Sequence, residues 1–250
     1  MRRALFAAFL IVAVAAPLLP AADPPVMDPE TRFNIGLAHL RDGRPQLALE
    51  EFRRAVKQDA RNPYFHKGLG LAHAALRQYG DATASFRKAL ELNPYYVDVR
   101  NDLGTALILA GKRAEGKTEF LTAFNDPTNP TPEVSARNLG QAHFEERNYN
   151  EAINWFRTSL SRNKSYADAY LGLSDALLAL NKAAEAATVL ETGVRECPDA
   201  AAVQVSLGDA YFRLGRFADA RLRLEEAQRK DPMGADGRRA AELLKHFPVR

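Results

Sequence analysis

The stretch from Pro63 to Pro94 reads PYFHKGLGLAHAALRQYGDATASFRKALELNP, and most of the chain repeats its pattern. It holds a glycine (Gly70), an alanine twelve residues later (Ala82) and an aromatic residue four further on (Phe86). The glycine position recurs with spacings of 34, 34, 36, 34 and 34 residues, as Gly36, Gly70, Gly104, Gly140, Ser174 and Gly208. The aromatic position keeps these spacings, as Phe52, Phe86, Phe120, Phe156, Leu190 and Leu224. The chain is therefore a tandem array of six units.

Each unit carries the pattern of two amphipathic helices. Gly70 and His73 lie on one helical stripe, and Ala82 and Phe86 lie on a second. The turn between the two helices falls at a position that favours left-handed backbone in four units, as Gly43, Gly111, Asn181 and Gly215. This pattern predicts an all-α solenoid in which each helix pair buries its apolar surface against the next pair.

The unit resembles the tetratricopeptide repeat, on the evidence of Leu69-Gly70, Ala82, Phe86, Ala89 and Asn93-Pro94. The resemblance covers roughly residues 29 to 234. It implies a right-handed superhelix of six antiparallel helix pairs, at 29–62, 63–96, 97–132, 133–166, 167–200 and 201–234, followed by a capping helix at 235–246. It also implies a binding scaffold rather than an enzyme, with a partner protein or peptide held in a groove along the concave surface.

The first 22 residues read as a secretory signal peptide. Arg2 and Arg3 precede an apolar run from Ala4 to Leu19, and small residues follow at Ala21 and Ala22. Residues 23–28, rich in proline, are then a linker to the repeats. We expect an exported protein of the bacterial periplasm or cell envelope. The alternative is an uncleaved leader, in which case the apolar run would contact the membrane.

Charge and cysteine content exclude two classes of protein. Of 34 basic residues, two lie in the leader, so residues 23–250 hold 32 basic and 31 acidic groups, without the clustered excess typical of a nucleic-acid surface. The single cysteine, Cys197, has no partner in the chain for an intramolecular disulfide. We expect no nucleic acid, small-molecule substrate or cofactor.

Candidate binding residues lie on the first helix of each unit, which lines the concave surface in the repeat family that this chain resembles. Apolar side chains gather toward the start of the array, and polar ones gather in its middle. A groove of this kind can hold an extended or helical segment of a partner. The predicted groove residues are Phe33, Leu37, Lys67, Leu71, Asn101, Thr105, Arg137, Asn138 and Gln141.

One motif offers an alternative of another class. Residues 111–118, GKRAEGKT, match the phosphate-binding loop G-x-x-x-x-G-K-[ST] of nucleotide hydrolases. That loop requires a buried strand before it, whereas the repeat register places a helix on both sides. The register therefore predicts a turn at Gly111 and a helix across Gly116, so a nucleotide site is not expected. Three histidines, His39, His73 and His143, share one repeat position, which favours packing over metal binding.

The two extra residues of the array fall in the proline-rich joint from Asn125 to Glu133, which is either a local contact site or a tolerated insertion. With the leader, the six units and the Asn138-Leu139-Gly140 that follows, this joint resembles the type IV pilus assembly proteins of the PilW type. Those proteins help an outer-membrane secretin assemble, and they carry a lipid-bearing cysteine that this leader lacks. Another periplasmic or polysaccharide-export complex is the alternative for a scaffold of this kind.

Overall fold

The computed structural model describes residues 27–247, which form thirteen α-helices and no strand. The predicted signal peptide, and the linker before Met27, lie outside the described residues. The helices are α1 (Pro29–Arg41), α2 (Pro45–Gln58), α3 (Pro63–Ala75), α4 (Tyr79–Leu92), α5 (Val97–Leu109), α6 (Arg113–Asn125), α7 (Pro132–Glu145), α8 (Tyr149–Arg162), α9 (Ala167–Ala179), α10 (Ala183–Glu196), α11 (Ala201–Arg213), α12 (Phe217–Lys230) and α13 (Ala235–Leu244).

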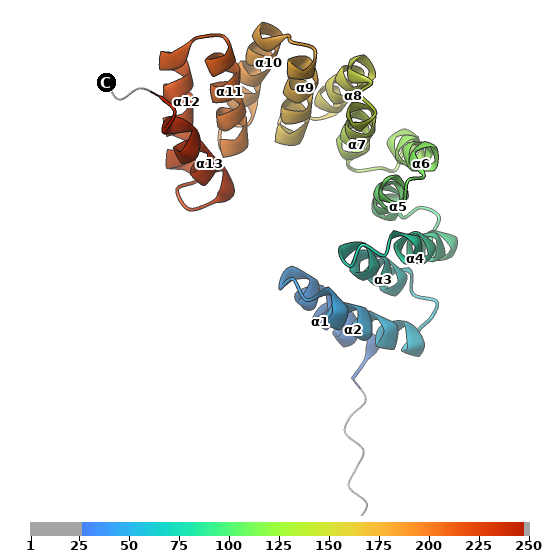
Figure 1. Ribbon diagram of the computed structural model, residues 1–250. Helices are drawn as coiled ribbons and strands as arrows, with labels where there is room; N and C mark the ends of the chain where they lie inside the picture. The colour runs from blue at the N-terminus through green and yellow to red at the C-terminus, as the bar shows by residue number, and fades with distance from the viewer. Residues whose placement is uncertain (1–26, 248–250) are drawn as a thin grey trace, which may run out of the picture.

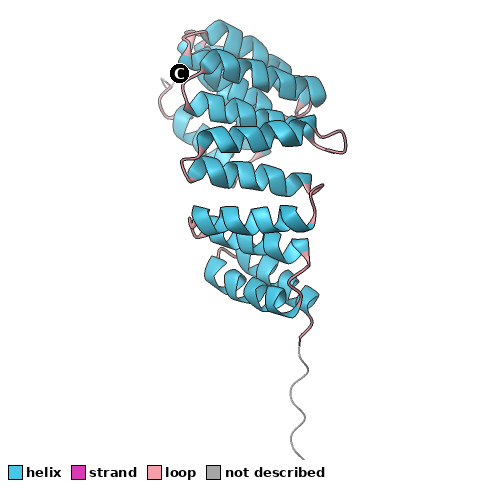
Figure 2. Cartoon of the chain, turned by 90° about the vertical axis from the view of Figure 1, so that its right-hand side faces the viewer, coloured by secondary structure: helices cyan, strands magenta, loops and turns pink. Residues whose placement is uncertain are grey.

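The helices follow one another along an arc, as Figure 1 shows. The odd-numbered helices α1 to α11 line its inner side, here called the concave face, and the even-numbered helices lie outside them. In the view of Figure 2 the helices are stacked in chain order, with the loops along the two edges. Within the described chain each helix contacts only its neighbours and, on the inner side, the next odd-numbered helix. The predicted all-α solenoid is confirmed.

The recurring glycine and phenylalanine form one packing unit. Phe86 and Phe156 are 1% and 0% exposed, and each ring lies against the glycine of its own unit. A Cβ atom on Gly140 would lie 2.8 Å from the Phe156 ring, closer than side chains pack. The glycine therefore lets the first helix of a unit approach the aromatic residue of the second, which explains why the two positions recur together.

Left-handed turns join the helices of every unit. Gly43, Gly111, Gly215 and Asn181 have φ between 60° and 83°, as predicted from their residue types. The structure adds Arg77 (φ 59°) and Arg147 (φ 60°) at the same repeat position. At each turn a backbone N–H reaches back to a carbonyl of the first helix, as Gln78 N does to His73 O at 2.9 Å. The turn geometry thus recurs in all six units, including the two that carry arginine.

The joint between α6 and α7 is held by its own hydrogen bonds. Asn129 donates its side-chain amide to the carbonyl of Ala123 at 2.7 Å, and its amide oxygen accepts the N–H of Thr131 at 2.8 Å. Thr131 occupies the N-cap position and Pro132 the first turn of α7. The Thr131 side chain makes no capping hydrogen bond, however.

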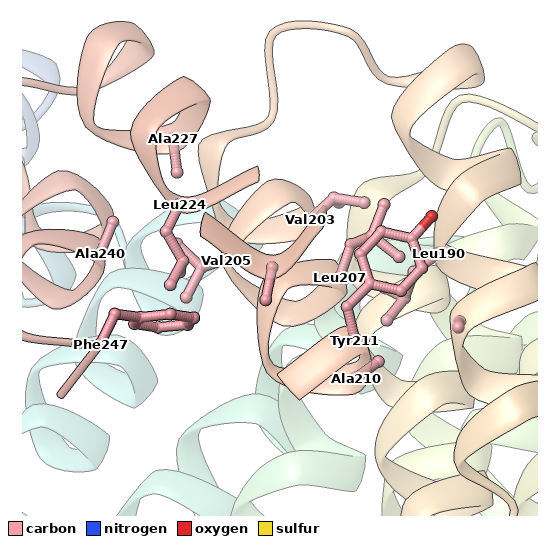
Figure 3. Close-up of a cluster of buried hydrophobic side chains, with 12 residues drawn as sticks. Leu190, Val203, Val205, Leu207, Ala210, Tyr211, Leu224, Ala227, Ala240 and Phe247 are labelled. Carbon is pink, nitrogen blue, oxygen red and sulfur yellow. The ribbon is translucent and has the colours of Figure 1, made fainter. Parts of the chain in front are cut away.

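The last helix, α13, closes the C-terminal end of the array. Ala240 of α13 is fully buried, and Phe247 is 7% exposed. Both belong to an apolar cluster with Leu224 of α12 and Val205 and Leu207 of α11, shown in Figure 3. The Phe247 ring also lies 5.4 Å from that of Phe212. The predicted cap, residues 235–246, therefore contains the helix but stops one residue short of its largest buried side chain.

Candidate functional site

The nine predicted groove residues all lie on the first four helices of the concave face, from α1 to α7. Three of them, Phe33, Leu37 and Leu71, are partly buried against the cores of the first units. The Phe33 ring lies 5.5 Å from that of Phe52 and 5.7 Å from that of Phe65. The apolar end of the predicted groove is thus continuous with the core and offers a partner only part of each side chain.

Four predicted residues meet in one pocket of about 110 Å³ between α5 and α7. Its polar lining comes from Thr105, Arg137, Asn138 and Gln141 together with Glu145, and its apolar lining includes Ile108 and Phe120. Gln141 donates its amide to Glu145 at 3.2 Å, and Thr105 donates its hydroxyl to the Asn101 carbonyl at 3.0 Å. The pocket combines an apolar floor with oriented polar groups, the usual composition of a recognition site.

Both basic residues predicted for the groove are paired with an acid of the next odd-numbered helix. Lys67 Nζ of α3 lies 3.9 Å from Asp98 Oδ2 of α5. Arg137 Nη2 of α7 lies 3.7 Å from Asp168 Oδ2 of α9. The sequence predicted that both basic side chains contact a partner, but it did not predict their ion pairs. The lateral offset between neighbouring units, which brings each acid close, cannot be read from spacing along one helix.

Asp102 is a partly buried carboxylate on this face. Burial, against the opposing effect of the Lys67 ammonium and with a smaller contribution from Asp98, raises its pKa from 3.8 to about 6. The neighbouring Asn101 is only 8% exposed, and its amide oxygen has no hydrogen-bond donor. An ionised carboxylate and an unpaired acceptor therefore lie next to each other on α5, where each lowers the stability of the fold.

Tyrosines border the same part of the concave face. The rings of Tyr64 and Tyr96 lie 5.3 Å apart, edge to face, and the Lys67 ammonium is 5.0 Å from the Tyr96 centroid. Burial raises the pKa of Tyr96 to about 12. Tyr64 is 53% exposed, and Tyr95, which precedes Tyr96 in the sequence, is 77% exposed. The prolines before Tyr64 and Tyr95 mark unit boundaries in the sequence, but nothing there signals that these rings are exposed.

Comparison with family models supplies the identity of the repeats. Residues 33–97 and 205–244 match one model described as tetratricopeptide repeat, and residues 143–204 match a second with the same description. Together these matches span more than half of the chain. The chain is a tetratricopeptide repeat protein. The sequence resemblance to this family is thereby confirmed, and so are the stacked helix pairs that it implied.

Two solved structures share the fold of this tetratricopeptide repeat protein over nearly their whole length. PilW, described as a widely conserved type IV pilus biogenesis factor, superposes with a TM-score of 0.67 at 19% identity over 85% of this chain and 98% of PilW. PilF of Pseudomonas aeruginosa gives a TM-score of 0.65 at 19% identity, over 86% and 97% of the two chains. Identities this low establish a common fold only.

A curated relative is much longer than this repeat protein. The human protein O-mannosyl-transferase TMTC3 is 23% identical over 204 residues, which are 80% of this chain and 22% of TMTC3. The chain thus spans about a fifth of that relative's length.

The phosphate-loop match of this repeat protein forms a turn and a helix. Gly111 (φ 83°) is the turn residue, and Gly116 lies in α6, where an added Cβ would meet the Gly104 carbonyl at 2.6 Å. Lys117 Nζ is bonded to Glu146 Oε2 at 2.7 Å. No strand precedes this loop in the described chain, and the Gly116 amide already donates to the Lys112 carbonyl at 3.0 Å within the helix, so the amides do not form the phosphate cradle.

The shared histidine position is a packing site in the described units. His73 is 8% exposed, and its Nδ1 lies 2.7 Å from Gln78 Oε1, while His39 and His143 are partly buried. Burial, together with Lys117, lowers the pKa of His143. Between residues 27 and 247, no three His, Cys, Asp or Glu side chains gather closely enough to hold a metal ion. The helices there are also too short or too polar to span a bilayer.

Proposed function

We propose that this tetratricopeptide repeat protein is a non-catalytic scaffold that binds a segment of a partner protein on its concave face. The observation that carries the proposal is the pocket between α5 and α7, where side chains from two neighbouring units meet over an apolar floor. Such a surface can accept a peptide in extended or helical form, and apolar side chains of that peptide would fill the pocket.

More narrowly, the partner belongs to a bacterial envelope machine, the type IV pilus secretin being our leading candidate. The leader predicted at residues 1–22 supports export to the periplasm or cell envelope. The likeness to PilW and PilF supports the pilus version because it extends over 98% and 97% of those chains.

Site-specific cross-linking in cells that make the protein tests both levels of the proposal. A photoreactive residue replaces Thr105 or Gln141 on the concave face, and a matched control replaces the exposed Thr122 on the outer helix α6. We expect an adduct with one envelope protein from the two concave positions and none from the control. Adducts from Thr122 alone would overturn concave binding, and concave adducts that contain no secretin would overturn the pilus version only.

A further inference from the structure

Hydrogen-bond acceptors outnumber cations where α3 meets α5 on the concave face. Asp98, Asn101 and Asp102 follow one another at helical spacing and share one face of α5. Opposite them α3 provides Lys67, whose ammonium is 3.9 Å from Asp98 and whose charge only partly offsets the burial of Asp102. Two carboxylates therefore share one cation.

Asn101 gives an independent sign that a donor is missing. Its side chain is more than nine-tenths buried, and its amide oxygen accepts no hydrogen bond. Buried side-chain acceptors in folded proteins are nearly always paired, and an unpaired one lowers stability. A ligand that brings donors to this face of α5 would pair with the two carboxylates and, once the enclosed Asn101 amide turns outward, with its oxygen as well.

The rings of Tyr64 and Tyr96, which border this part of the concave face, also suit a cation. Lys67 already lies 5.0 Å from the centroid of Tyr96, which shows that this ring accepts a positive charge. Tyr64 contacts Tyr96 edge to face and is half exposed, so a side chain arriving from solvent passes an aromatic edge before it reaches α5. Tyrosine and arginine are also the residue types that most often carry binding energy at protein interfaces.

We propose that Tyr64, Lys67, Tyr96, Asp98, Asn101 and Asp102 form a subsite, the α3–α5 subsite, for an arginine or lysine side chain of the partner segment. The proposal rests on the proposed function and names the chemistry of its partner. Arginine fits better, because its five donors form a planar fork that can reach a carboxylate and a neighbouring amide oxygen while its face stacks on a tyrosine. Lys67 is then the internal cation that the partner displaces.

The same charges argue against an anionic partner group at this place. A carboxylate or phosphate would approach Asp98 and Asp102, and Lys67 is already engaged with Asp98. Repulsion between like charges on a partly buried face weakens such a complex. The subsite thus distinguishes a basic segment from an acidic one.

Binding of the full chain to an array of short random peptides tests the proposal. The tightest binders are resynthesised with each basic residue changed to glutamine, and dissociation constants are measured with the wild type, with the double variant Asp98→Asn/Asp102→Asn and with Lys67→Met. The control is Glu50→Gln/Asp81→Asn, which removes two exposed carboxylates from the outer helices α2 and α4. Thermal unfolding checks that each variant is folded.

We expect arginine to be enriched among the binders, and its change to glutamine to weaken binding about tenfold or more. That difference should vanish in the Asp98→Asn/Asp102→Asn variant and persist in the control. Lys67→Met should strengthen binding of arginine peptides about threefold, since it removes the competing internal cation.

Four results would overturn the subsite. Peptides that bind without preference for a basic residue remove the inference and leave concave binding standing. The inference is likewise removed, and concave binding stands, if Lys67→Met abolishes peptide binding or if most of the peptides that bind are acidic. Failure of every peptide to bind would overturn the inference and the proposed function together.

Discussion

The ammonium of Lys67 on α3 lies 3.9 Å from the carboxylate of Asp98 on α5, and Arg137 on α7 is paired with Asp168 on α9 in the same way. Both pairs join first helices of consecutive units across the concave face. Pairs this exposed contribute at most about 1 kcal/mol to stability. Because both predicted basic side chains are paired with an acid, this part of the concave face offers a partner mainly hydrogen-bond acceptors.

Asp102 makes the fold less stable at neutral pH, and Asp102→Asn should reverse this. Its pKa is raised to about 6 in the fold against 3.8 for an ordinary aspartate, so between these values the folded state holds more protons than the unfolded state. The free energy of unfolding therefore falls as pH rises from about 4 to about 6. We expect Asp102→Asn to exceed the wild type by on the order of 2–3 kcal/mol at pH 7, with the difference vanishing near pH 4.

Urea unfolding of both proteins across this pH range measures the difference directly. Asp81→Asn, which removes an exposed carboxylate on α4, is the control and should give only a small difference. A difference for Asp102→Asn that is constant with pH, or that grows as pH falls, would contradict the assigned burial of the Asp102 carboxylate. If the variant is more stable yet binds basic peptides less well, Asp102 lowers stability in return for recognition.

Arg77 and Arg147 are expected to limit stability because their backbone is left-handed. Each has φ near 60°, where an L side chain costs roughly 1–2 kcal/mol relative to glycine, partly offset by the greater freedom of glycine in the unfolded chain. Arg77→Gly and Arg147→Gly should each raise the free energy of unfolding by about 0.5–1 kcal/mol. Gly43→Arg, the reverse change at the equivalent turn, should lower the free energy of unfolding. The urea midpoints of the three variants and the wild type show whether each change stabilises or destabilises the fold.

Phe86→Ala should destabilise an interior unit of the array. Phe86 is 1% exposed and packs with Leu103 and Leu107 of the following unit, so its removal opens a cavity between two units. The expected loss is about 3–5 kcal/mol, larger than that of Leu224→Ala in the terminal unit. Leu222→Ala, at a side chain that is 53% exposed, is the surface control. A loss from Phe86→Ala no greater than the control would mean that the repeat register is wrong.

The repeat period predicted most of the fold because the contacts that define a unit are local. Gly140 meets Phe156 within one helix pair, so the spacing of the two residues suffices to place them. The turns were predicted from residue type in four units only. Packing between the two helices imposes the same left-handed backbone on Arg77 and Arg147, and residue propensity alone does not reveal it.

The candidate site was predictable in position but not in chemistry. Repeat spacing placed Thr105 and Gln141 on adjacent first helices, where they share a pocket. The partners of Lys67 and Arg137 come from neighbouring units, and the burial of the Asn101 amide depends on how closely those units approach. Such relationships are set by the curvature of the array, which one unit of sequence does not specify.

The repeat pattern did not predict the buried Phe247, and we expect its replacement by alanine to destabilise only the C-terminal end of the array. It lies beyond α13, is 7% exposed, contacts the Phe212 ring at 5.4 Å and has the Arg221 guanidinium 5.6 Å from its own ring centroid. Phe247→Ala should cost about 3 kcal/mol, at the lower end of the range for a buried phenylalanine, because the end of an array can relax. Since units contact only their neighbours, amide hydrogen exchange should accelerate in α12 and α13 and stay unchanged in α3 to α5.

The control is Lys245→Ala, a change at an exposed side chain two residues before Phe247, which should leave hydrogen exchange in both regions unaffected. Acceleration throughout the chain would show that the array unfolds as a single cooperative block, and an unchanged pattern would show that Phe247 does not hold the cap.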